Sequence, residues 1–259
     1  NFLIRFHLKS FNTSNPSFKE LMILQISEPL KEIELSKNIK KLGSINDDVS
    51  QKVKSQYEEN PYPRWRYGSH NVNQKISIKQ AINNEIFPNF INLNEVKNQL
   101  KVLIAGCGTG NQILQSQRYI NAELTCIDLS LSSLSYAKRK INELEINNVE
   151  LIQMDILEVG LLKKKFDIIE CGGVLHHMNE PWKGLKKLLD VLKENGFLKL
   201  GLYSEIARQD IIKAKKHISI KKYKPNKTDI QLFREDVISG NFRDIVKIQQ
   251  RPSFYTTSE

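Results

Sequence analysis

The stretch Lys101-Val-Leu-Ile-Ala-Gly-Cys-Gly-Thr-Gly110 decides the fold that this sequence predicts. Its apolar part, Val102 to Ala105, is typical of a buried parallel strand. The run stops at three glycines spaced two residues apart, which are Gly106, Gly108 and Gly110. Glycine adopts the positive φ angles of a tight strand-to-helix turn and lets a ligand approach bare backbone. The stretch therefore predicts a strand that ends in a loop for a nucleotide-like ligand.

Three more apolar runs follow, and each ends at a polar or glycine signal. The first leads to Asp128, 18 residues after Gly110, where a carboxylate can accept both hydroxyls of a ribose. The second leads to Asp155, which is placed to meet an adenine edge. The third ends at Cys171 and continues into Gly172-Gly173-Val-Leu-His-His177. Because the carboxyl ends of parallel strands lie at one edge of a sheet, these signals predict a single cleft.

Strand and helix patterns alternate through this part of the chain, which predicts right-handed crossovers and a parallel sheet of the α/β class. The strands are expected at residues 101–105, 123–127, 149–154, 166–171 and 197–203, and the helices at 110–119, 131–144 and 181–193. Asn195-Gly196 is expected to separate the last helix from the last strand.

The order of these features resembles the class I S-adenosylmethionine (SAM)-dependent methyltransferases from about Gln51 to about Ser204. Within that class, the chain looks most like the bacterial type-12 methyltransferase-domain proteins that often follow tetratricopeptide repeats. The resemblance rests on Gln56-Tyr-Glu-Glu-Asn-Pro-Tyr-Pro-Arg-Trp65, the Gly106 loop, Ile127-Asp-Leu-Ser130 with Ser132 to Lys140, and Cys171 to Met178. It implies a Rossmann-like, SAM-binding sheet flanked by helices, with a helical N-terminal extension.

The resemblance also implies SAM as the cofactor and assigns its binding to residues at the strand ends. These cofactor-binding residues are Gly106, Gly108, Gly110, Asp128, Leu129, Asp155, Ile156 and Cys171. Many members of the class have an acidic residue two positions before the first glycine, near the ammonium group of SAM, where this chain has Ile104. We therefore expect the loop carbonyls and the end of the fourth strand to hold the amino acid end of SAM.

The acceptor side of the cleft is expected to involve histidines and aromatic side chains. His176 is the candidate catalytic residue, because a neutral imidazole can take a proton from a hydroxyl or an amine. Tyr62, Trp65 and His177 are expected to form a lid over the substrate. The alternative for the histidines is a packing role, and the alternative for the aromatic residues is an N-terminal cap.

The function predicted from these features is methyl transfer from SAM to an acceptor, with a small molecule favoured and RNA or protein left open. An NAD-dependent oxidoreductase is one alternative, although a dinucleotide fingerprint wants a small residue where this chain has Asn111. A non-catalytic domain that binds SAM or RNA is the other. The RNA alternative rests on the net charge of +10 and on a cluster of seven lysines, whose simpler interpretation is a solvated helix face. The cluster consists of Lys213, Lys215, Lys216, Lys221, Lys222, Lys224 and Lys227.

Composition narrows the class of protein further. The three cysteines fall in or beside expected central strands, and we expect buried thiols in a reducing compartment. No spacing of Cys and His suits a metal ion, and no apolar run suits a membrane span or a signal peptide. The cytoplasm is the expected location. DNA base methylation is not expected, because the sequence has no Pro-Cys nucleophile and no Asp/Asn-Pro-Pro-Tyr motif.

The chain is expected to divide into four segments. They are a helical extension at 1–60, a lid and linker at 61–100, the SAM-binding core at 101–204 and a basic helical segment at 205–259. Within the first and last of these segments, helices are expected at 29–42, 49–57, 205–218 and 229–239. No pattern matches the antiparallel hairpin that closes the sheet in class I methyltransferases, so strand 197–203 is expected at an open edge. We expect the chain to be truncated at both ends and to aggregate or lose stability through this edge.

Overall fold

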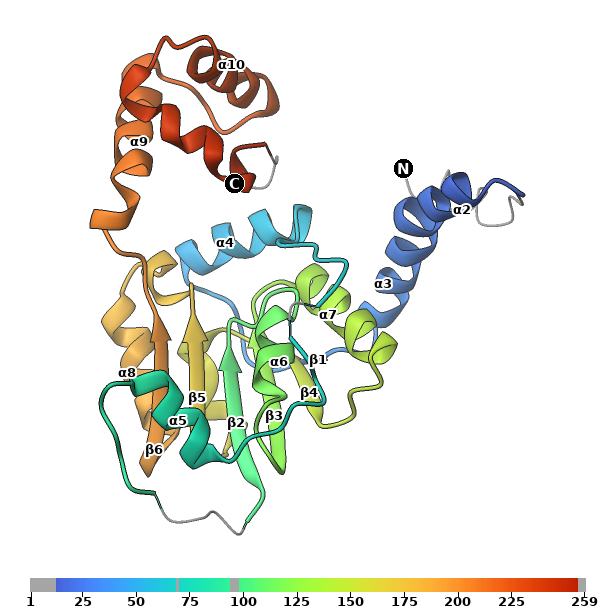
Figure 1. The fold of residues 1–259 in the computed structure, drawn as a ribbon, viewed down its shortest axis with the longest axis vertical. Coiled ribbons are helices and arrows are strands. Elements are labelled where there is room, and N and C mark those ends of the chain that lie inside the picture. Colours follow the sequence, from blue (N-terminus) through green and yellow to red (C-terminus); the bar gives the residue numbers. More distant parts are fainter. Residues whose placement is uncertain (1–12, 69, 94–97, 256–259) are drawn as a thin grey trace. The chain divides into compact units, whose positions relative to one another are not determined.

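The computed structural model describes residues 13–68, 70–93 and 98–255, in two compact units (Figure 1). The first unit comprises residues 1–201 and the second comprises residues 202–259. Residues 1–12 of the expected extension and 256–259 of the expected basic segment lie outside the described residues. The division of the chain into four segments stays a prediction.

The first unit is built on a six-stranded sheet with the order β1-β4-β3-β2-β5-β6. Its strands are parallel, as expected, and β1 is a strand that the sequence did not predict. The strands are β1 (Lys40–Lys41), β2 (Leu100–Ala105), β3 (Ala122–Asp128), β4 (Val149–Gln153), β5 (Phe166–Gly172) and β6 (Leu192–Gly201). The chain moves outward from β2 through β3 to β4 and then returns to place β5 on the other side of β2. The strand order thus reverses between β2 and β5, which is where open α/β sheets bind ligands.

Two apolar cores cover the two faces of the sheet, because side chains alternate along each strand. On β2, Val102 and Ile104 belong to one core, and Leu103 and Ala105 belong to the other. The first core receives α5 (Ile78–Ile86), α6 (Asn111–Ser116) and α7 (Leu131–Glu143), and the second receives η2 (Ile156–Leu162), η3 (Leu175–His177) and α8 (Pro181–Val191). This arrangement is the Rossmann-like fold that the sequence predicts. Helix α5, which the sequence analysis did not predict, begins at the N-cap Ser77 and buries Ala81.

The N-terminal helices confirm the expected extension but correct one of its boundaries. They are α2 (Pro16–Met22), the π-helix η1 (Ile23–Ser27), α3 (Glu28–Ser36) and α4 (Asp48–Glu59). The helix expected over 29–42 ends at Ser36, and Lys40–Lys41 pairs with β4 instead. Burial of Ile39 and an ion pair between Lys40 and Glu150, 3.0 Å long, favour this pairing over a further helical turn.

Strand β6 also differs from expectation at its start. Helix α8 ends at Val191 and β6 begins at Leu192, so Asn195-Gly196 lies inside the strand and does not separate the two elements. The register shifts there, since Phe166 faces Leu192 whereas Ile168 faces Phe197. Such a bulge suits glycine, because a Cβ at Gly196 would lie 3.0 Å from the carbonyl oxygen of Asp167.

Strand β6 lies at an edge of the sheet, as expected, and β5 is its only neighbour among the described strands. The described part of the second unit, residues 202–255, contains no strand, so no hairpin covers β6 within it. Its elements are η4 (Ile206–Arg208), α9 (Gln209–Lys221), α10 (Lys227–Ile238), η5 (Arg243–Gln250) and η6 (Pro252–Tyr255). They enclose a separate small core that includes Val237, Ile245 and Phe254. Aggregation through the β6 edge stays a prediction.

Candidate active site

The glycine loop that follows β2 has the backbone that its sequence predicts. Gly106, Gly108 and Gly110 have φ angles of 78°, 51° and 93°, a region that side chains disfavour. At Gly106 a Cβ would overlap with the side chain of Val174, so packing alone requires that glycine. At Gly108 the nearest atom to a Cβ is the carbonyl oxygen of Tyr62, 4.0 Å away. The middle glycine therefore leaves bare backbone beside open space, as a ligand loop requires.

Asp128, at the end of β3, fixes this loop in place. Its Oδ2 accepts a hydrogen bond of 2.8 Å from the backbone N–H of Gly108, and its Oδ1 accepts one of 2.9 Å from the N–H of Ser130. Burial raises the pKa of Asp128, the backbone hydrogen bonds oppose that shift, and the nearby Glu58 carboxylate adds to it. A carboxylate oxygen has a second lone pair, so both oxygens can still accept a ribose hydroxyl. The loop-holding role was not predicted from the sequence.

Glu58 on α4 is a second acidic residue at this edge, and its role is not apparent from the sequence. Its carboxylate accepts hydrogen bonds from the N–H of Leu131, at 2.7 Å, and from the N–H and the hydroxyl of Ser132, at 2.9 and 2.6 Å. Negative charge is favourable at the first turn of a helix, and α7 begins here. The signal lay within the Gln56–Trp65 motif, where Glu58 was quoted without a role. It fastens α4, which lies beyond the carboxyl ends of the strands in Figure 1, to α7.

The segment after α4 is bound directly to the glycine loop. The indole N–H of Trp65 donates to the carbonyl oxygen of Thr109 at 3.1 Å, and the hydroxyl of Thr109 donates to the carbonyl oxygen of Pro63 at 2.6 Å. The ring of Trp65 meets that of Tyr136 edge-on, with 6.0 Å between centroids, and the Tyr136 hydroxyl donates to the Trp65 carbonyl. The structure therefore brings Trp65 and the backbone of Tyr62 to the loop, whereas their role as a substrate lid stays a prediction.

A buried charged cluster ties this segment to the N-terminal helices. Arg139 on α7 is 1% exposed and forms ion pairs with Glu28, Glu32 and Glu143 at 3.0, 2.9 and 2.6 Å. Arg64 shares Glu32 and donates to both of its carboxylate oxygens, at 3.0 and 3.1 Å. Arginine stays charged in proteins, and burying that charge without partners is costly, so these ion pairs hold α3, α7 and the segment around Arg64 together.

Asp155 and Ile156 lie where the chain leaves β4. Asp155 is buried and its Oδ1 accepts from the N–H of Leu157 at 2.9 Å, which makes it the N-cap of η2. Ile156 is buried, and Leu129 is half-buried at the end of β3. The structure thus gives Asp155 a structural role, and its contact with adenine stays a prediction.

The end of β5 carries the remaining expected residues. Cys171 is buried, and burial raises the pKa of its thiol to about 12, so it stays a neutral thiol at physiological pH. His176 and His177 form η3 with ring centroids 4.3 Å apart, the first half-buried and the second exposed. All three cysteines are free and buried, as expected.

Metal-binding clusters and membrane-spanning helices are both absent from the described residues. No group of three or more His, Cys, Asp or Glu side chains there is placed to hold a metal ion. Within the same residues, no helix combines the length and the apolar character that crossing a membrane requires.

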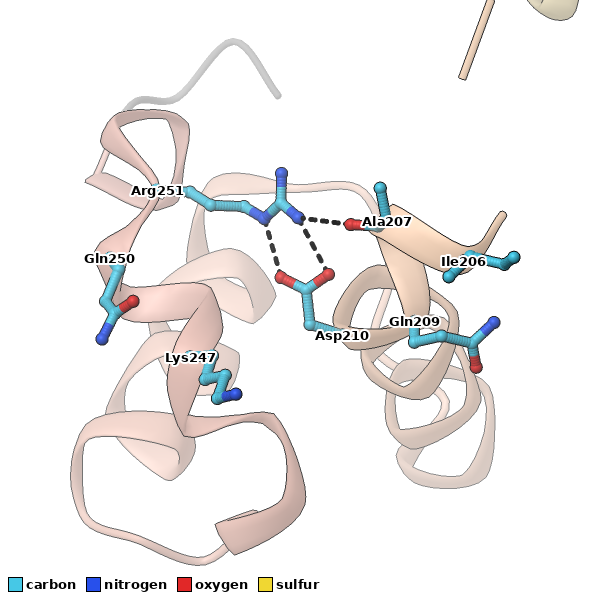
Figure 2. Close-up of a pocket in the computed structure, with 7 residues that line it drawn as sticks. All are labelled: Ile206, Ala207, Gln209, Asp210, Lys247, Gln250 and Arg251. Carbon is cyan, nitrogen blue, oxygen red and sulfur yellow. Dashed lines mark hydrogen bonds and ion pairs between the residues drawn. The ribbon is translucent and has the colours of Figure 1, made fainter. Parts of the chain in front are cut away.

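The second unit contains a cavity of about 440 Å³ next to an ion pair (Figure 2). Arg251 donates to both carboxylate oxygens of Asp210, at 2.7 and 2.9 Å, and holds the pKa of that carboxyl below its ordinary value. The other lining residues are Ile206, Ala207, Gln209, Lys247 and Gln250. The lining contains no cysteine, serine, threonine or histidine, and its one carboxylate, Asp210, is paired with Arg251. The seven lysines of the cluster are exposed, as on a solvated face.

The comparisons with known proteins concern mainly the first unit. Residues 102–196 match the family model described as a methyltransferase domain. An uncharacterised protein of Synechococcus sp. is 33% identical over 126 residues, which is 46% of this chain and 29% of that protein. A malonyl-[acyl-carrier protein] O-methyltransferase of Acetivibrio thermocellus is 29% identical over 116 residues, 44% of this chain and 40% of that enzyme. The enzyme of the same name from Priestia megaterium is 27% identical over 231 residues, 70% of this chain and 79% of that enzyme.

The matched region holds the strands and the loop that build the candidate site. It includes the Gly106–Gly110 loop, Asp128 and the end of β5. The match to this chain spans less than half the length of the first two relatives, so these comparisons concern the matched domain and not the whole proteins. Residues 102–196 therefore match a methyltransferase domain in sequence, and they contain the glycine loop and the strand ends described above.

Proposed function

We propose that this protein transfers the methyl group of SAM to a small-molecule acceptor in the cleft at the carboxyl ends of β2, β3 and β5. The observation that carries the proposal is the Gly106–Gly110 loop, open at Gly108 and hydrogen-bonded to Asp128. Bare loop backbone suits the methionine part of SAM, and a carboxylate on the next strand suits the ribose. Both features lie within the matched methyltransferase domain.

We assign the parts of SAM along this cleft in the order of the strands. Gly106, Gly108, Gly110 and the backbone at Cys171 bind the methionine part. Asp128 accepts the ribose hydroxyls. Leu129, Asp155 and Ile156 surround the adenine. The half-buried side chain of Leu129 supports the last assignment, since it leaves apolar surface for a face of the adenine ring.

Bound SAM would supply a methyl group attached to a sulfonium sulfur. A lone pair of the acceptor would form the new bond to the methyl carbon, while the carbon–sulfur bond breaks and its electron pair goes to sulfur. The residues of the chain have to align the acceptor and exclude water. Tyr62 and Trp65 do this from the segment that is bonded to Thr109, together with His177. His176 takes the proton of an acceptor that is protonated at neutral pH.

The acceptor atom that we favour is an oxygen on a small molecule. Two of the relatives are named as O-methyltransferases, although their substrate is not carried over to this chain. The exposed lysines of the cluster keep RNA as an outcome of the test. The buried free thiols fit the reducing cytoplasm, where we place the reaction.

Calorimetric titration of the protein with SAM, S-adenosylhomocysteine, NAD and ATP tests the cofactor. We expect binding of SAM and S-adenosylhomocysteine and none of NAD. Incubation with methyl-labelled SAM and an extract separated into small molecules, RNA and protein then tests the acceptor, and we expect label among the small molecules. Binding of NAD without SAM would contradict the proposal, and label confined to RNA would replace the acceptor class.

A further inference from the structure

Gln112 lies between the glycine loop and the end of β5. It is the second residue of α6 and follows the loop directly. Its Nε2 lies 3.4 Å from the carbonyl oxygen of Gly172. A Cβ at position 172 would overlap with this Nε2, so the glycine there makes room for the Gln112 side chain. The side chain thus bridges the two loops that flank the reversal point of the sheet.

The other end of the same amide is an unpaired acceptor. The Oε1 of Gln112 is buried, and no donor reaches it within the described part of the chain. The NH₂ group of Gln112 faces the carbonyl of Gly172, so the oxygen on the same carbon points away from that carbonyl. A buried acceptor without a donor costs about 1–3 kcal/mol, so proteins normally pair such atoms. The geometry points to a donor that belongs to a ligand.

The surroundings indicate which donor this is. Ile104 stands where many enzymes of the class have an acid for the SAM ammonium group. Glu170, next to Ile104 in the paired strands, is already bound by Ser116, Tyr119 and Arg118 at 2.5, 2.7 and 3.0 Å. Its charge is therefore paired, and these contacts hold α6 so that Gln112 faces Gly172.

We propose that the Oε1 of Gln112 accepts a hydrogen bond from the α-ammonium group of SAM, in place of the missing acid at Ile104. The inference rests on the proposed function and adds a residue that selects for the amino acid end of the cofactor. A neutral amide oxygen binds an ammonium group less strongly than a carboxylate does, and the Gly172 carbonyl fixes its direction.

The test compares three ligands on the full chain by calorimetry. S-adenosylhomocysteine has the ammonium group, its desamino analogue keeps the carboxylate but lacks the amine, and 5′-methylthioadenosine lacks the whole amino acid. The wild-type protein should bind S-adenosylhomocysteine about tenfold or more tightly than the desamino analogue, as expected for a hydrogen bond to a charged group. In Gln112→Leu this ratio should fall towards one, while the Kd for 5′-methylthioadenosine stays the same. In Gln112→Glu the ratio should rise, because the carboxylate restores the acid.

Gln115→Leu, one turn further along α6, is the matched control and should keep the wild-type ratio. A wild-type ratio in Gln112→Leu, or an unchanged ratio in Gln112→Glu, would overturn the inference. The two variants are read independently, so failure of either one to fold leaves the other decisive. If the wild-type protein bound none of the three ligands, the proposed function itself would fail, which is a different outcome.

Discussion

The loop after β2 and the loop after β5 follow neighbouring strands at the same edge of the sheet but are held in different ways. The first, Gly106–Gly110, is fixed by Asp128 from β3 and by Trp65 from the covering segment. The second, Gly172–Met178, closes on its own backbone and on β6, through Gly173 to Gly201 at 2.8 Å, and exposes His177. Side chains from several elements therefore fix the first loop, whereas the second is held largely by backbone hydrogen bonds and leaves His177 exposed.

The largest effect is expected at Gly108. Gly108→Val should raise the Kd for SAM by about a hundredfold or more, because its side chain would fill the space beside the loop backbone. The fold should survive with a lowered melting temperature: the nearest atom to a Cβ is 4.0 Å away, but a φ of 51° is strained for valine. Calorimetry with SAM and a thermal melt measure the two effects separately.

Gly106→Val is the contrasting variant. Its side chain would overlap with Val174, so this change should also lower the melting temperature. Normal SAM binding by Gly108→Val would show that the cofactor does not lie on the loop.

Asp128→Ala should cause the next largest rise in the Kd for SAM. It removes the acceptor for the ribose hydroxyls and also the acceptor for the Gly108 N–H. A hydrogen bond to a charged group contributes roughly 1.5–3 kcal/mol, so the Kd should rise about tenfold to a hundredfold. An unchanged Kd in calorimetry would show that Asp128 does not bind the ribose.

As the pH rises, the ionisation of Asp128 should change SAM affinity and the free energy of unfolding in opposite directions. Its pKa is raised in the folded protein, mainly by burial, so the folded state binds more protons than the unfolded state between the ordinary and the raised pKa. Within that window its contribution to the free energy of unfolding falls as the pH rises. SAM affinity should rise over the same window, because the ionised carboxylate is the better acceptor.

The measurement for this titration is a pair of pH series, SAM binding and urea unfolding, in the wild type and in Asp128→Asn. Subtracting the variant removes the titration of all other groups. If the wild-type minus variant differences in SAM affinity and in the free energy of unfolding changed in the same direction with pH, the account would be contradicted.

A smaller effect is expected at Glu58, which binds the covering helix α4 to the first turn of α7. Glu58→Gln should lower the free energy of unfolding by about 1 kcal/mol, because the amide retains the shape but loses the charge at the helix terminus. SAM affinity should fall only severalfold, since Asp128 and the loop remain. Ser132→Ala removes one of the three contacts and serves as the milder comparison. If Glu58→Gln raised the Kd for SAM more than Asp128→Ala does, helix α4 and not the glycine loop would dominate binding.

The sequence predicted the region around the first loop better than the rest because its signals are local. An apolar run that ends in alternating glycines specifies β2 and its turn, and the N-cap at Ser130 marks the start of α7 within a few residues. Strand β1 was missed because two residues have no pattern of their own and pair only with β4. Helix α5 was missed because the region before β2 was interpreted as a linker.

The missed site residues share a physical cause. Glu58, Arg139 and Gln112 act through partners far away in the sequence, at Leu131, Glu32 and Gly172. A charged or amide residue on a helix is usually solvated, so its type and spacing carry no sign of a buried partner. The expected binding role of Asp128 was inferred from its place at a strand end, but its bond to Gly108 depends on how the loop folds back.

A crystal structure of the protein with S-adenosylhomocysteine tests the central claim most directly. The account predicts the ribose hydroxyls within hydrogen-bonding distance of the Asp128 carboxylate, with the methionine part against the backbone of Gly108. Binding of S-adenosylhomocysteine away from the ends of β2 and β3, or a ribose without contact to Asp128, would contradict it.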